Sequence, residues 1–151
     1  MSPCDLQERW RRSESLHIDG VVFASGRVIL FDVKELRAAD GTVTCLAAPF
    51  AETSAESVLH YNSDAWVEVT STSRVDAGNA RRVLAGEGAM GNEGFIALER
   101  DETLEWVFFC TQSNPFSDLR VEGDIAYATD GYGNDWQIPL ASPQDLKVTA
   151  R

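Results

Sequence analysis

The chain has 151 residues, enough for one domain with its own core, and its 44% hydrophobic and 25% charged residues exclude a disordered chain. Thirteen Lys and Arg stand against 24 Asp and Glu, so the net charge is −11. This negative field repels phosphate backbones and anionic lipid, which excludes nucleic-acid and membrane partners from our expectation and favours a basic protein partner. The alternative is that the acidic residues serve solubility alone.

The first residues favour a short helix, and the following residues favour strands. Pro3 suits the first turn of a helix and Asp5 faces its free amides, so we expect a helix over residues 3–13. Two apolar runs then flank Ser25-Gly26 as the strands of a hairpin do, and a third run follows Asp40-Gly41. These runs are VVFA (21–24), RVILFDV (27–33) and TVTCLAA (42–48).

After a candidate second helix at residues 51–61, the chain reads as a meander of short strands. The candidate strands are WVEVTSTS (66–73), RRVLA (81–85), GFIALER (94–100), LEWVFFCT (104–111), LRVEG (119–123), DIAYATD (124–130) and NDWQIPL (134–140). Residues 104–111 are apolar on both faces, with Leu104, Trp106, Phe108 and Cys110 on one face and Val107 and Phe109 on the other, so we expect both faces to be covered.

These patterns predict the fold class. We expect a mainly β, single-domain antiparallel meander over residues 1–151, either a sandwich or a curled sheet, with a short N-terminal helix. The alternative is an α+β fold, which depends on whether residues 51–61 are helical and pack on a sheet.

The cysteines and the apolar runs indicate the compartment. Cys4, Cys45 and Cys110 are odd in number and lack CxxC spacing, so we expect them to be reduced, with Cys45 and Cys110 as small core residues. No run approaches the ~20 apolar residues of a membrane span, and the first residues are charged where a signal peptide is apolar. We therefore expect a cytoplasmic protein.

The segment GEGAMG (86–91) has the spacing Gly-x-Gly-x-x-Gly of phosphate-binding loops. A dinucleotide loop needs a helix that begins at its glycines, because the helix amides bind the pyrophosphate. Here a β-rich run follows, and Glu87 and Glu93 would repel phosphate. We therefore expect a glycine-rich turn between two strands, and no cofactor.

Metal and catalytic patterns are weak in this sequence. His17 and His60 have no ligand or carboxylate partner at a diagnostic spacing, so we expect them to be structural or exposed. DGYGND (130–135) carries oxygen ligands but lacks the spacing of an EF-hand, so we expect a turn and no metal. We expect no catalytic residues.

Two acidic segments are the candidate binding site for a basic partner. Four carboxylates crowd one hairpin turn, where we expect them to be solvated, and Tyr132 is expected to project among the carboxylates of a second turn. The candidate partner-binding residues are Glu99, Asp101, Glu102, Glu105, Asp130, Tyr132 and Asp135.

The segments GEGAMGNEGFIAL, LEWVFF, SNPF and DWQIPL, in that order, resemble small acidic immunity proteins of bacterial polymorphic-toxin systems. The resemblance covers residues 83–143 and includes no catalytic motif. It implies a cytosolic, non-enzymatic protein that neutralises a cognate toxin domain by occluding its active site. Two alternatives remain: a small β-fold enzyme of hydrolase type, and a homo-oligomeric structural protein that associates through apolar edge strands.

Overall fold

The computed structural model describes the backbone of residues 3–150 and the side chains of residues 5–150. This part contains two α-helices, one short 3-10 helix and thirteen strands. The helices are α1 (Pro3–Arg11), α2 (Ala55–Tyr61) and η1 (Pro143–Asp145). The strands are β1 (Glu14–Leu16), β2 (Gly20–Phe23), β3 (Arg27–Arg37), β4 (Val43–Ser54), β5 (Trp66–Glu68), β6 (Thr70–Gly78), β7 (Arg81–Glu87), β8 (Gly94–Arg100), β9 (Thr103–Cys110), β10 (Ser117–Glu122), β11 (Ile125–Thr129), β12 (Asp135–Pro139) and β13 (Lys147–Thr149).

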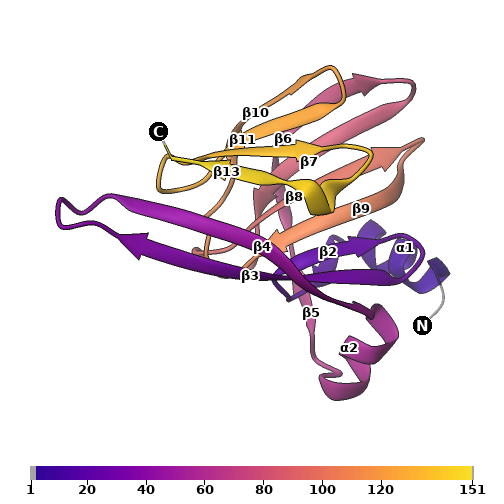
Figure 1. Cartoon of the computed structure of the whole chain (residues 1–151). Helices are drawn as coiled ribbons and strands as arrows, with labels where there is room; N and C mark the ends of the chain where they lie inside the picture. Colours follow the sequence, from indigo (N-terminus) through magenta and orange to yellow (C-terminus); the bar gives the residue numbers. More distant parts are fainter. Residues whose placement is uncertain (1–2, 151) are drawn as a thin grey trace.

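The strands form three antiparallel sheets, which confirms the mainly β expectation. The large sheet has seven strands in the order β4-β3-β2-β9-β8-β7-β6, and the small sheet has four in the order β10-β11-β12-β13. β1 and β5 pair separately. Figure 1 shows the small sheet over one face of the large sheet, and it shows α1 beside β2 and β9. The arrangement is an open sandwich.

Aromatic side chains fill the space between the two sheets. Phe108 of β9, Phe116 and Trp136 of β12 are each at most 1% exposed. The Trp136 ring lies 5.6 Å from the Phe108 ring and 5.2 Å from the Phe116 ring, measured between centroids. The Trp106 indole N–H donates to the Leu140 carbonyl at 2.9 Å, so this aromatic ring also has its polar atom satisfied.

A second apolar cluster covers the opposite face of the large sheet. Leu6 and Trp10 of α1 pack there with Phe95 and Phe109, and the Trp10 and Phe95 rings meet edge to face. The Gln7 side-chain amide makes two hydrogen bonds to the Leu104 backbone: its Nε2 donates to the carbonyl at 2.8 Å, and its Oε1 accepts from the amide at 2.9 Å. β9 is therefore buried on both faces, as its sequence predicts.

Three local expectations were wrong in detail. Leu104 lies in the α1-side cluster and not beside Trp106, because Glu105 is an extra, unpaired residue of β9 between them, and this bulge shifts the β8–β9 register by one residue. Residues 66–73 do not form one strand: β5 pairs with β1 and β6 pairs with β7, with buried Val69 between them. The second helix is α2, and residues 51–54 belong to β4.

The hairpin of β3 and β4 projects from the body of the molecule (Figure 1). Pro49 and Phe50 interrupt the register of β4, where Phe31 pairs with Pro49 and Leu30 pairs with Ala51. The end of the hairpin next to its own turn, where Arg37 pairs with Val43, is contacted by residues 130–135. The Asn134 side-chain amide donates to the Val43 carbonyl at 3.1 Å.

Candidate functional site

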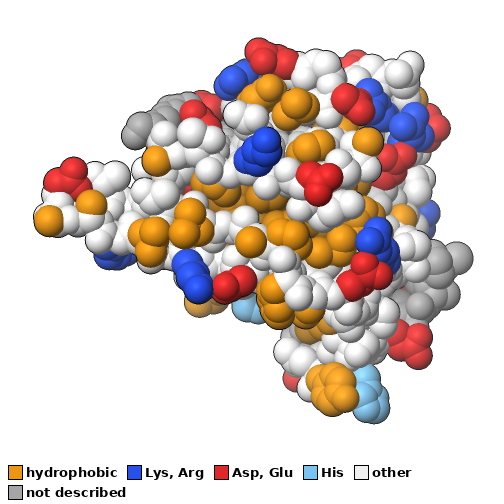
Figure 2. All heavy atoms as spheres, in the orientation of Figure 1, with side chains coloured by type: hydrophobic (Ala, Val, Ile, Leu, Met, Phe, Trp, Pro, Cys, Tyr) orange, Lys and Arg blue, Asp and Glu red, His pale blue; other side chains and the backbone are white. Residues whose placement is uncertain are grey.

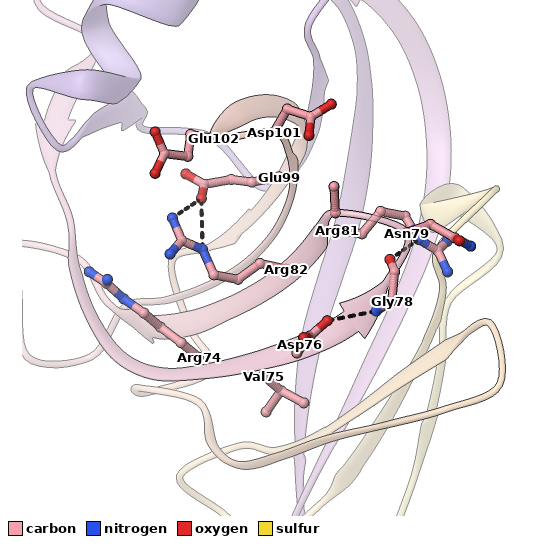
Figure 3. Close-up of a pocket in the computed structure, with 11 residues that line it drawn as sticks. Arg74, Val75, Asp76, Gly78, Asn79, Arg81, Arg82, Glu99, Asp101 and Glu102 are labelled. Carbon is pink, nitrogen blue, oxygen red and sulfur yellow. Dashed lines mark hydrogen bonds and ion pairs between the residues drawn. The ribbon is translucent and has the colours of Figure 1, made fainter.

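A pocket of about 530 Å³ lies at the ends of four neighbouring strands, β6 to β9 (Figure 3). It contains most of the acidic turn that the sequence singles out. Its lining residues are Arg74, Val75, Asp76, Gly78, Asn79, Ala80, Arg81, Arg82, Glu99, Asp101 and Glu102.

Two tight turns form the rim of this pocket. Asn79 and Ala80 join β6 to β7 with φ of 56° and 61°, and Asp101 and Glu102 join β8 to β9 with φ of 51° and 64°. Positive φ at both central residues is the geometry of a type I′ hairpin turn. The Asp101 amide donates to the Ala80 carbonyl at 2.9 Å, so the second turn is fixed against the first.

Glu99 lies below this rim and is not solvated, which corrects the expectation for it. Only 7% of the surface of Glu99 is exposed. One carboxylate oxygen accepts from the Arg82 guanidinium at 2.6 and 3.1 Å, and the other accepts from the Trp10 indole N–H at 2.6 Å. Glu99 is therefore a buried ion-pair partner that ties α1 to the sheet.

Other carboxylates near the pocket also have arginine partners. Glu105 is half-buried and binds Arg100 at 2.6 Å, and this hydrogen bond raises the pKa of the Arg100 guanidinium. Asp124, from the β10–β11 turn, binds Arg81 at 2.8 Å. These contacts neutralise most of the charge at this end of the sheets.

Asp101 and Glu102 differ from these neighbours. Both are exposed, and within the described residues neither carboxylate lies in an ion pair. In Figure 3 the two side chains stand above the pocket, on the side opposite Arg74 and Asp76. Of the four acidic residues predicted in this hairpin, these two are the ones that are exposed and outside the ion pairs described above.

The second acidic turn is built differently from the expectation. Asp130 is 3% exposed, and its carboxylate accepts from the Tyr132 amide at 2.8 Å, the Asn134 amide at 3.0 Å and the Trp136 indole at 2.9 Å. Tyr132 does not project outward, because its hydroxyl donates to Glu35 at 3.0 Å. Burial, followed by this hydrogen bond, raises the pKa of Tyr132. These contacts hold the turn against β3.

The two acidic turns also lie apart. Asp135 begins β12, is half-buried and accepts from the Thr129 hydroxyl at 3.5 Å. Asp124 and Asp130 flank β11 at its two ends, and Asp124 is the one that binds a lining residue of the pocket, Arg81. The seven predicted residues therefore do not form one surface, and Asp130, Tyr132 and Asp135 do not line the pocket.

The glycine-rich segment is a turn between β7 and β8, as expected, and no helix begins there. Its inner side holds a buried carboxylate: Glu93 is 2% exposed and accepts from the Met90 amide at 3.2 Å. Its other oxygen binds the His17 ring. A Cβ on Gly88 would lie 2.6 Å from the Glu93 carboxylate, so glycine is required for the turn to close around it.

Sequence reasoning missed the carboxylate partner of His17, because residues 17 and 93 are far apart in the chain. It also missed the Arg82–Glu99 pair, although a signal was present. Arg82 and Glu99 are direct cross-strand partners, and a hairpin centred on the glycine-rich turn predicts that register.

Among the described residues, no three His, Cys, Asp or Glu side chains gather as metal ligands do. In the same part of the chain, no helix is long and apolar enough to cross a membrane. Comparison with protein-family models, curated proteins and solved structures finds no match to this chain.

Proposed function

We propose that this chain is a non-catalytic binding protein of the immunity type, which occludes a basic bacterial toxin domain. Asp101 and Glu102 are the residues that would meet the cationic side chains of the toxin. The pocket behind them, of about 530 Å³, would receive a side chain from the same surface.

The observation that carries the proposal is the conformation of these two residues. Asp101 and Glu102 occupy left-handed backbone geometry, with φ of 51° and 64°. Glycine adopts this geometry freely, and Asn and Asp adopt it at little cost, whereas Glu loses about 1–2 kcal/mol, so the strained residue of the turn is Glu102. Backbone strain of this kind is found at functional sites, where the side chain is needed for another purpose. Two exposed carboxylates without ion pairs fit such a purpose.

The overall charge supports the same partner. The net charge of −11 attracts a basic protein over a longer range than the local contacts do. Electrostatic attraction of this kind acts mainly on the association rate and is screened by salt. We therefore expect a rapid, salt-sensitive encounter with a basic surface.

The test is to co-express the chain with each protein encoded beside its gene and to separate the mixtures by size-exclusion chromatography. A one-to-one complex is the expected result. Its association rate, measured by stopped flow, should fall by about tenfold between low and high salt. An association rate that is unchanged by salt would refute the electrostatic mechanism, and turnover in a hydrolase panel would favour the enzyme alternative.

A charge-matched pair of variants locates the contact. Asp101→Asn with Glu102→Gln removes two charges at the pocket, and Asp40→Asn with Asp64→Asn removes two exposed charges elsewhere. Both double variants have the same net charge. We expect the first to lower the association rate several-fold more than the second. Equal effects would mean that the net charge acts alone and that the turn makes no specific contact.

A further inference from the structure

The edge strand β4 has a surface that the proposed toxin contact does not use. β4 is the outermost strand of the large sheet and is 12 residues long. Residues 43–51 carry no charged side chain. Leu46 is 49% exposed and Phe50 is 65% exposed. Figure 2 shows hydrophobic side chains along this hairpin up to the point where it joins the body. A long uncharged edge of this kind is a template for pairing with another strand.

The register shows which backbone groups of β4 point away from β3. The Ala38 amide donates to the Thr42 carbonyl at 2.9 Å, so these two residues form a hydrogen-bonded pair. Such pairs alternate along an antiparallel ladder, which places Leu46 and Ala48 toward β3 and Ala47 away from it. Val43 lies four residues before Ala47, so its backbone groups point to the same side of β4. Its carbonyl accepts from the Asn134 side chain, which lies outside the large sheet, and this contact supports the assignment.

The open part of the edge is short. The turn at residues 130–135 covers the β4 end near Val43, and Cys45 is fully buried there beside Asp130. At the other end, Pro49 has no amide to donate and Phe50 forms the bulge. Ala47 therefore lies at the centre of the open edge. A groove of about 390 Å³, lined in part by Ala47, Ala48 and Val148, runs beside it.

We propose that β4 pairs with β4 of a second copy of this chain, antiparallel and across a twofold axis at Ala47. In this register the two Ala47 residues exchange their amide-to-carbonyl hydrogen bonds. Leu46 of each copy then lies opposite Ala48 of the other, so a large side chain meets a small one on each side of the axis. The two large sheets become one continuous sheet.

Charge favours a second copy at this place over a basic partner. Residues 27–54 contain three cations and four anions, a net charge of −1, within a chain of −11. Three ion pairs, Arg27–Glu52, Lys34–Asp32 and Arg37–Glu35, satisfy six of these seven charges within the hairpin, and the seventh, Asp40, accepts from the Thr42 amide in the turn. Copies that meet through this hairpin therefore keep their strongly acidic remainders apart, and the hairpin offers a basic protein little to attract it.

The dimer leaves the proposed toxin contact free. β4 is at one edge of the large sheet, whereas the pocket lies at β6 to β9, toward the other edge. Dimerisation therefore presents two copies of the Asp101–Glu102 turn at its outer ends. The inference does not rest on the proposed function, because variants on β4 test the dimer alone and variants of the Asp101–Glu102 turn test the toxin contact alone.

Sedimentation equilibrium of the full chain over a range of concentrations tests the pairing. We expect a reversible monomer–dimer equilibrium. Leu46→Lys makes two lysines diagonal neighbours across the twofold axis, at positions about 7–8 Å apart, and removes the Leu46–Ala48 contact, so it should raise the dissociation constant at least about tenfold. Ala47→Pro removes both central donors without removing a β3–β4 hydrogen bond, and it should have a similar effect.

Leu36→Lys is the matched control. Leu36 is 51% exposed and lies on the same face of the hairpin as Leu46. It belongs to β3, however, which is not the edge strand. We expect it to change the dissociation constant by less than about twofold. Circular dichroism checks that each variant folds. A chain that stays monomeric at every concentration would overturn the proposal, and so would equal weakening by Leu36→Lys and Leu46→Lys, which would indicate a general apolar contact.

Discussion

Glycine at position 102 should make this protein more stable, which is unusual for a substitution that removes a side chain. Glu102 has φ of 64° and follows Asp101, which has φ of 51°. A non-glycine residue in this left-handed region is strained by about 1–2 kcal/mol, because its Cβ crowds the backbone. Glycine removes this strain, but it also makes the unfolded chain more flexible, at a cost of about 0.5–1 kcal/mol. The expected net gain from Glu102→Gly is about 0.5–1 kcal/mol.

The measurement is thermal unfolding followed by circular dichroism or calorimetry. For a chain of this length, 1 kcal/mol corresponds to a shift of about 2–4 °C in Tm, so we expect Glu102→Gly to raise Tm by about 1–4 °C. Glu102→Gln is the control, because it removes the charge and keeps the strained backbone. Its Tm should stay within about 1–2 °C of the parent.

The two variants also separate stability from binding. Both remove the Glu102 carboxylate, so both should slow association with a basic partner, although one of them is more stable than the parent. A stabilising substitution that weakens binding is the result expected of a residue kept for function. If Glu102→Gly lowers Tm, as glycine does within regular structure, the backbone at this turn is not strained and the main support for the proposed function is lost.

Two further predictions concern buried groups. Gly88→Ala places a methyl group 2.6 Å from the Glu93 carboxylate and 2.9 Å from the Phe109 ring. Urea denaturation should show a loss of about 1–3 kcal/mol, whereas Gly91→Ala, in open space on the same turn, should stay within about 0.5 kcal/mol. Equal effects would contradict the close contact around Glu93. Burial raises the pKa of Cys45 and of Cys110 to about 12. In a Cys4→Ser background at pH 8, a thiol reagent should therefore modify neither residue until guanidinium unfolds the chain, and rapid labelling of the folded protein would contradict their burial.

Much of the strand content was predictable because it depends on short-range patterns. Alternating and continuous apolar runs, separated by turn residues such as Ser25-Gly26, identify β2, β8 and β9 with nearly correct bounds, and they identify the start of β3 but not its end at Arg37. The apolar character of β9 on both faces also predicted its central, covered position. The bulge at Glu105 was not predictable, because a one-residue shift in pairing leaves the local composition unchanged.

The sequence by itself determined the negative charge, the mainly β class and the glycine-rich turn, since each follows from composition or from neighbouring residues. The tertiary structure decided which carboxylates remain available. Glu99 and Asp130 are buried by hydrogen-bond donors that come from α1, β7 and β12, whereas Asp101 and Glu102 stay exposed on a turn. Whether a charged side chain is paired or free depends on segments far away in the chain, and local sequence carries no record of those contacts.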